Sequence, residues 1–154
     1  MSVNSSSGPV AVVATISSDA HSWNLVVLQL LLEEHGYTVH NLGPCTPPAE
    51  LVDCLRFVRP DLVVLSTVNG HGLIELPQVV RDLRGTRVVA GGKLNTTRVR
   101  ADDIRRLMDL GVDRVFTESE PLEAFFGYLR ALDRSERRSL RPAHREMSPR
   151  AVAG

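Results

Sequence analysis

Residues 61–68 read DLVVLSTV, and this stretch decides the fold. A short, continuous apolar run that ends in hydroxyl residues and is bounded by turn residues is typical of a strand buried on both faces of a parallel sheet. The sequence contains two more runs of this kind and two weaker strand candidates. They are PVAVVATI (9–16) and TRVVAGG (86–92), then YTVHNLG (37–43) and DRVFT (113–117).

Helical patterns separate these strands, over residues 24–36, 46–60, 73–85, 101–111 and 121–134. Gly36 is the expected C-cap of the first helix, and Thr46 the expected N-cap of the second. Pro77 near the start of the third predicts an irregular first turn. Buried strands that alternate with helices indicate an α/β protein with a doubly wound parallel sheet. Five such units fit a flavodoxin-like (Rossmann-like) fold with strand order 2-1-3-4-5.

The composition suits one globular domain without a nucleic-acid or membrane partner. We expect the domain to span 9–133, with a disordered N-terminus over 1–8 and a flexible basic C-terminal tail over 134–154. Eighteen basic residues balance eighteen acidic ones, so no net field favours a polyanion. No apolar run reaches the roughly 20 residues of a membrane span. The start of the chain lacks a signal-peptide pattern, and a cytoplasmic location is expected.

In such folds, ligands bind beyond the carboxyl ends of the strands, at the switch between the first and third strands. This rule selects the loops 17–23, 68–72, 91–100 and 117–120. The first loop contains Asp19 and His21. A neutral imidazole is a good metal ligand, and a carboxylate that accepts its second N–H fixes the ring and strengthens the donor nitrogen. The alternative is that Asp19 caps the following helix and His21 is merely exposed.

The other loops carry weaker signals. Ser66 and Thr67 end a buried strand with hydroxyls, and Gly70 and Gly72 surround His71, which by itself is typical of a surface loop. Gly91 and Gly92 end the fourth strand, where a side chain would obstruct a flat ligand or where the chain simply turns. The P-loop and GxGxxG patterns are absent from the sequence, as is any zinc-type cysteine spacing.

Taken together, these residues resemble the cobalamin-binding family with the fingerprint DxHxxG…SxL…GG. The three elements stand at Asp19–Asn24, Ser66–Val68 and Gly91–Gly92, each after the expected strand. Within that family, the chain is most similar to the small, cobalamin-binding subunits of glutamate mutase (methylaspartate mutase), from about Val10 to Leu132. Asn24 replaces the fingerprint glycine, Val68 replaces leucine, and TESEP (117–121) lacks a glycine that relatives tend to have.

The resemblance implies a set of cofactor-binding residues. His21 would be the lower axial ligand of cobalt, in place of the cofactor's own dimethylbenzimidazole, and Asp19 would hydrogen-bond His21. The displaced nucleotide tail would thread between the first and third strands, where Ser66 would bond to it and Asn24 would take up room near it. The full implied set is Ser18, Asp19, Ala20, His21, Ser22, Asn24, Ser66, Thr67, Val68, Gly70, Gly91, Gly92, Lys93, Leu94, Asn95, Thr96 and Thr97.

The resemblance also implies an isomerase that uses adenosylcobalamin for a radical carbon-skeleton rearrangement. The chain would work only with a larger catalytic subunit, a TIM barrel like the epsilon subunit of glutamate mutase, which would hold most of an amino-acid substrate such as glutamate. Two alternatives stay open: a stand-alone corrinoid carrier or cobalamin-dependent sensor, and a flavodoxin-like protein that binds flavin, acts as a response-regulator-like module or has lost cobalamin. Asn24 is the feature that keeps the last of these open.

Overall fold

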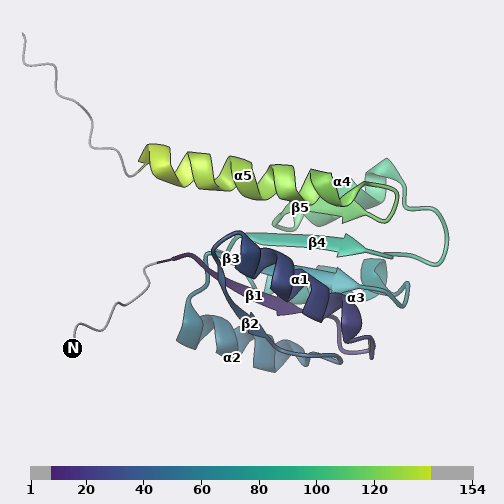
Figure 1. The fold of residues 1–154 in the computed structure, drawn as a ribbon. Helices are drawn as coiled ribbons and strands as arrows, with labels where there is room; N and C mark the ends of the chain where they lie inside the picture. Colours follow the sequence, from purple (N-terminus) through teal and green to yellow (C-terminus); the bar gives the residue numbers. More distant parts are fainter. Residues whose placement is uncertain (1–7, 140–154) are drawn as a thin grey trace, which may run out of the picture. The chain divides into compact units, whose positions relative to one another are not determined.

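The computed structural model describes residues 8–139 and alternates five strands with five helices. The strands are β1 (Val10–Ala14), β2 (Thr38–Asn41), β3 (Leu62–Thr67), β4 (Val88–Gly92) and β5 (Val112–Thr117). The helices are α1 (Trp23–Glu34), α2 (Pro48–Val58), α3 (Gly72–Arg81), α4 (Ala101–Asp109) and α5 (Leu122–Ser139). Figure 1 shows this alternation along the chain.

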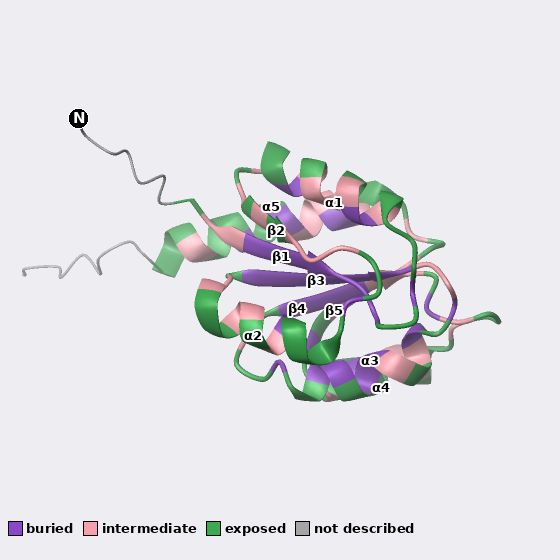
Figure 2. Ribbon diagram, turned by 90° about the horizontal axis from the view of Figure 1, so that it is seen from below, coloured by how far each residue is buried: buried purple, intermediate pink, exposed green. Residues whose placement is uncertain are grey.

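All four strand pairings are parallel, and the strand order is β2-β1-β3-β4-β5. This confirms the predicted flavodoxin-like fold. Helix α1 lies on one face of the sheet, whereas α2, α3 and α4 lie on the other (Figure 2). The carboxyl ends of β1 and β3 are neighbours in the sheet, because Ala14 pairs with Leu65. The loops that follow these two strands therefore begin side by side.

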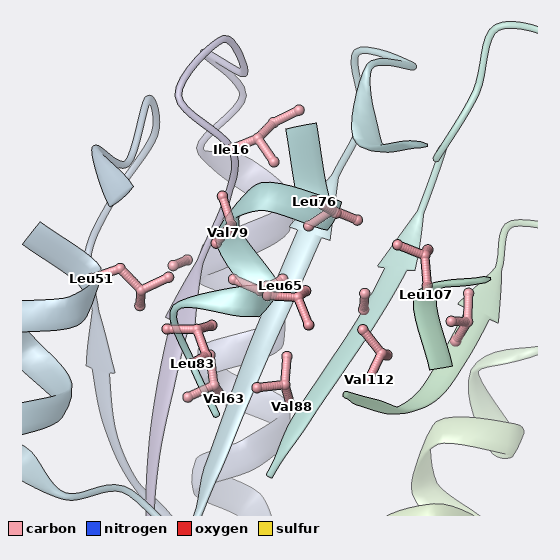
Figure 3. Packing of buried hydrophobic residues seen from close by; sticks show 14 of the residues in the cluster. Ile16, Leu51, Val63, Leu65, Leu76, Val79, Leu83, Val88, Leu107 and Val112 are labelled. Carbon is pink, nitrogen blue, oxygen red and sulfur yellow. The ribbon is translucent and has the colours of Figure 1, made fainter. Parts of the chain in front are cut away.

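The main core fills the space between the sheet and α2, α3 and α4 (Figure 3). Every second residue of a strand points into it, so Val63 and Leu65 of β3 contribute while Val64 and Ser66 face the α1 side. β3 is buried along its whole length, as the run DLVVLSTV predicts. Because β3 is the central strand, the residues that follow it, such as Asn69, lie at the middle of the carboxyl edge of the sheet.

Two of the helices differ from the prediction, α2 in its N-cap residue and α3 in the place of its proline. Thr46 is not the N-cap of α2: its hydroxyl donates to the Gly43 carbonyl (2.9 Å) and accepts from the Thr15 amide (3.1 Å), which ties the end of β1 to this loop. Pro47 is the N-cap residue instead. In α3, Pro77 lies inside the helix and not in its first turn. Gly36 follows α1 with a positive φ of 90°, as expected for a C-terminal glycine.

A second compact unit begins at Leu122 and contains helix α5. It continues to Ser139, so residues 135–139, which were expected in the flexible tail, are helical. The rest of the expected tail and most of the expected disordered N-terminus lie outside the described residues. In the part of the chain that the structure describes, no helix is both long and apolar enough to cross a membrane.

The close contact between the ends of β3 and β4 gives the first testable prediction. Gly92 has a φ of 96°, and a Cβ there would lie 2.2 Å from the Thr67 carbonyl oxygen. Gly85 has a similar φ of 88° but no atom within 4 Å of such a Cβ. We expect Gly85→Ala to lower the free energy of unfolding by about 1–2 kcal/mol through backbone strain alone. Gly92→Ala should cost about 3–5 kcal/mol, because overlap with rigid backbone is added.

Urea unfolding followed by circular dichroism measures both values. Equal losses in the two variants would show that β4 can move away from Thr67, and would contradict the tight fit at this edge.

Candidate functional site

The loops after β1 and β3 meet at the carboxyl edge of the sheet, and Asp19 joins them. Its side chain is fully buried. One carboxylate oxygen, Oδ1, accepts from the backbone amide of His21 (3.1 Å) and contacts His21 Nδ1 (2.7 Å). The other, Oδ2, accepts from the amides of Val68 (2.6 Å) and Asn69 (3.2 Å). Asp19 therefore links its own loop to the loop after β3 and does not cap α1.

These hydrogen bonds decide the charge of Asp19. Burial by itself raises the pKa of a carboxyl group, but the hydrogen bonds, led by that from Val68, outweigh it and hold the pKa of Asp19 below its ordinary value. Asp19 is therefore a carboxylate near neutral pH. It keeps the proton of the imidazole on the nitrogen that faces it, His21 Nδ1.

His21 is held at one ring nitrogen and open at the other. Its side chain is 57% exposed although its partner Asp19 is buried. With Nδ1 directed at the carboxylate, Nε2 is the nitrogen left to donate a lone pair to a metal. In residues 8–139, no group of three or more His, Cys, Asp or Glu side chains is placed to hold a metal ion. The site thus offers one oriented histidine donor.

A second set of hydrogen bonds supports the Asp19 loop from α3. Ser18 is the member that the sequence predicts at the site, whereas Ser17, Asn69 and Glu75 are not among the predicted residues. Glu75 accepts from the hydroxyls of Ser17 (3.0 Å) and Ser18. The Asn69 side chain donates to Ser18 (2.9 Å), and its own carbonyl oxygen accepts from the His71 amide (3.0 Å). No motif marks Glu75, because its role depends on where α3 packs. Asn69 could have been predicted from the sequence, because it directly follows Val68, the last residue of the second fingerprint element.

A polar cluster of Thr15, Asn24 and Ser66 lies on the α1 side of the sheet. Asn24, the second residue of α1, donates from Nδ2 to Ser66 Oγ (2.8 Å). Asn24 Oδ1 and Thr15 Oγ1 are both buried without a hydrogen-bond partner. Unpaired buried polar atoms are costly, and each requires an explanation such as a bound group. These two atoms are therefore available to a bound group beside Ser66.

Close packing of the backbone explains the glycines of the site. A Cβ at Gly91 would lie 2.7 Å from the Phe116 carbonyl oxygen, so β5 requires a glycine there. A Cβ at Gly70, whose φ is 86°, would lie 2.9 Å from Thr96 Cγ2. The glycines thus bring protein segments together, and they do not by themselves indicate space for a ligand.

The loop after β4 lies beside β3 at its start and then becomes exposed. The Lys93 amide donates to the Thr67 carbonyl (2.8 Å), and Thr67 Oγ1 donates to the Lys93 carbonyl (3.1 Å). Leu94 is buried in the core. The Asn95 side chain bonds to its neighbours Thr96 and Thr97, whose side chains are exposed. Ala20 and Ser22 are exposed on either side of His21. The structure thus brings all three fingerprint elements together, because Gly91 and Gly92 pair with Ser66 and Thr67 in the sheet. The exposed loop after Leu94 is less closely tied to them.

Comparisons with known proteins identify the family of the chain. The model of the B12 binding domain matches residues 9–126. The glutamate mutase sigma subunit of Halobacterium salinarum is 32% identical over 125 residues, which cover 78% of this chain and 84% of that protein. The HTH-type transcriptional repressor CarA of Myxococcus xanthus is 40% identical over 89 residues, which cover 55% of this chain and 31% of the repressor.

A solved structure is similar as well. A cobalamin-binding protein from Desulfitobacterium hafniense superposes with a TM-score of 0.59 and 25% identity, over 71% of this chain and 53% of that one. The family match covers most of the fold, from β1 into α5, and includes every residue of the site. The chain therefore belongs to the B12-binding domain family, among the small cobalamin-binding subunits of the glutamate mutase type.

Proposed function

We propose that this chain is the cobalamin-binding component of an adenosylcobalamin-dependent carbon-skeleton mutase. The observation that carries the proposal is the Asp19–His21 pair, which directs one free imidazole nitrogen outward at the switch between β1 and β3. His21 would be the lower axial ligand of cobalt. The nucleotide tail would enter beside Ser66, next to two buried polar atoms that have no protein partner.

Adenosylcobalamin supplies a cobalt–carbon bond that breaks homolytically and so starts radical chemistry. The chain's own residues bind and orient this group. Asp19 keeps the proton of the neutral His21 ring on Nδ1, so Nε2 carries the lone pair. The amides of Val68 and Asn69 hold Asp19 in place, which fixes the height and tilt of the ring above the sheet edge.

The remaining parts of the reaction are assigned to a second chain. His21 lies at the carboxyl edge of one parallel sheet and can approach only one face of a flat macrocycle. A larger catalytic subunit, of TIM-barrel type like the epsilon subunit of glutamate mutase, would cover the opposite face and hold an amino-acid substrate such as glutamate. The similarity to sigma subunits supports this division of labour.

Reconstitution tests the proposal. The purified chain is titrated with adenosylcobalamin while the fluorescence of Trp23, its single tryptophan, is recorded. We expect quenching, because Trp23 is exposed directly after the His21 loop. Addition of a glutamate mutase epsilon subunit should then give conversion of glutamate to methylaspartate, measured by NMR. Neither chain alone should be active.

A second candidate function is a cobalamin-dependent regulator or carrier, and the similarity to the CarA repressor is the observation that favours it. Cobalamin binding without turnover, in the presence of partner subunits and of several amino acids, would support this candidate and contradict the mutase. Absence of cobalamin binding would contradict both.

A further inference from the structure

The polar cluster of Thr15, Asn24 and Ser66 is composed of residues from two strand ends and one helix. Val12, Ala14 and Ile16 point into the main core, so Thr15 points to the α1 side. Ser66 is placed on the same side by the same alternation. Because Ala14 pairs with Leu65, the next residues along, Thr15 and Ser66, are neighbours across the two strands. Asn24 donates to Ser66 from the first turn of α1.

The hydrogen-bonding capacity of this cluster is only partly used. Asn24 Nδ2 donates to Ser66 Oγ, which leaves the Ser66 hydroxyl proton available for an acceptor. Asn24 Oδ1 is a buried acceptor without a donor, and Thr15 Oγ1 is a buried hydroxyl without any partner. If the Asn24 amide is turned over, one of its polar atoms is still left unpaired. Thr15 is 2% exposed and Ser66 is 8% exposed, so bulk water does not satisfy them.

We propose that this cluster selects among corrinoids by the base of the nucleotide tail. It favours a base whose outer edge carries hydrogen-bonding groups, such as adenine, over dimethylbenzimidazole, whose outer edge carries two methyl groups. This inference rests on the proposed function, because it assumes that the tail enters beside Ser66. It goes further by assigning a role to Thr15, which no fingerprint position includes, and to Asn24, which stands where the fingerprint has glycine.

The chemistry of the two bases separates them at this cluster. The exocyclic amine of adenine donates hydrogen bonds and its ring nitrogens accept them. Asn24 Oδ1 is an acceptor for the amine, and the hydroxyls of Thr15 and Ser66 are donors for ring nitrogens. Methyl groups in the same place would leave these polar atoms buried and unpaired, which lowers affinity.

The test compares two complete cobamides that differ only in the lower base, adenine or dimethylbenzimidazole. Their affinities for the full chain are measured by Trp23 fluorescence and by the absorption change of the corrin, without a partner subunit. We expect the adenine form to bind roughly tenfold tighter, the effect of satisfying about one buried polar group. Thr15→Val and Asn24→Gly should each reduce this ratio, and the double variant should bring it to about one.

A matched control is Thr38→Val, the same substitution at an exposed position of β2. It should leave the ratio unchanged. Equal affinities of the wild-type chain for the two cobamides, or tighter binding of the dimethylbenzimidazole form, would overturn the inference while the proposed function stands. A preference for adenine that survives in the double variant would also overturn it. If neither cobamide binds, the proposed function itself fails.

Discussion

Replacement of His21 by alanine is expected to lower the affinity for cobalamin by about 100-fold or more. The change removes the only oriented imidazole nitrogen of the Asp19–His21 pair, whereas loss of an outer partner of a ligand typically costs roughly 10- to 100-fold. Titration by Trp23 fluorescence measures the affinity. Because the side chain of His21 is more than half exposed, the variant should fold with nearly unchanged stability.

His71→Ala is the matched control for this variant. His71 is exposed in the neighbouring loop, and its hydrogen bonds to Asn69, Ile74 and Glu75 are made by its backbone amide and carbonyl, which alanine retains. Its loss should change the affinity little. If His21→Ala binds cobalamin as well as His71→Ala does, His21 is not the ligand.

Replacement of Asp19 by asparagine is expected to weaken both the fold and the cofactor site. Both oxygens of Asp19 accept hydrogen bonds from backbone amides. In asparagine one of these oxygens becomes an NH2 group, which would face backbone N–H groups that it cannot accept from. We expect a loss of about 1–3 kcal/mol in the free energy of unfolding. Cobalamin affinity should fall roughly 10- to 100-fold, because the ring of His21 loses its fixed partner.

Asp61→Asn is the control, since the side chain of Asp61 accepts from the Val10 amide at the opposite edge of the sheet. Its cofactor affinity should equal that of the wild type. Unchanged affinity in Asp19→Asn would show that Asp19 serves only the loop structure.

The pH dependence of stability separates the charge of Asp19 from its shape. In the folded chain, hydrogen bonds lower the pKa of Asp19. A carboxylate with a lowered folded-state pKa stabilises the fold above its unfolded pKa of about 3.9, and this contribution is lost as the pH falls through the folded pKa. The difference in unfolding free energy between wild type and Asp19→Asn should therefore shrink below about pH 4. A constant difference would contradict an ionised Asp19.

The sequence predicts the sheet well because its strands are buried on both faces. A run such as 61–68 has few alternatives to a central strand, and the strand order follows from five alternating units. Helix ends are predicted less well, because local residues have more than one use. Thr46 has the chemistry of an N-cap, yet its hydroxyl bonds to the backbone of Thr15 and Gly43, which only the tertiary fold brings near.

The site likewise combines a contact that the local sequence predicts with contacts that only the tertiary fold creates. The spacing of Asp19 and His21 within one loop is local, and the hydrogen bond between them could be predicted from it. The amides of Val68 and Asn69 reach Asp19 from about fifty positions away, and Glu75 reaches Ser17 from a helix. Asn24 is expected to occupy space near the tail, and in the structure it also bonds to Ser66. Contacts of this kind depend on packing and leave no periodic signal in the chain.

The coordination of cobalt by His21 is tested most directly by electron paramagnetic resonance of Co(II) cobalamin bound to protein whose histidines are ¹⁵N-labelled. Coordination by His21 predicts that each cobalt line is split into a doublet by the labelled nitrogen, and that this doublet is lost in His21→Ala. A triplet from the unlabelled nitrogen of the cofactor's own base, unchanged by the label and by the substitution, would contradict the account.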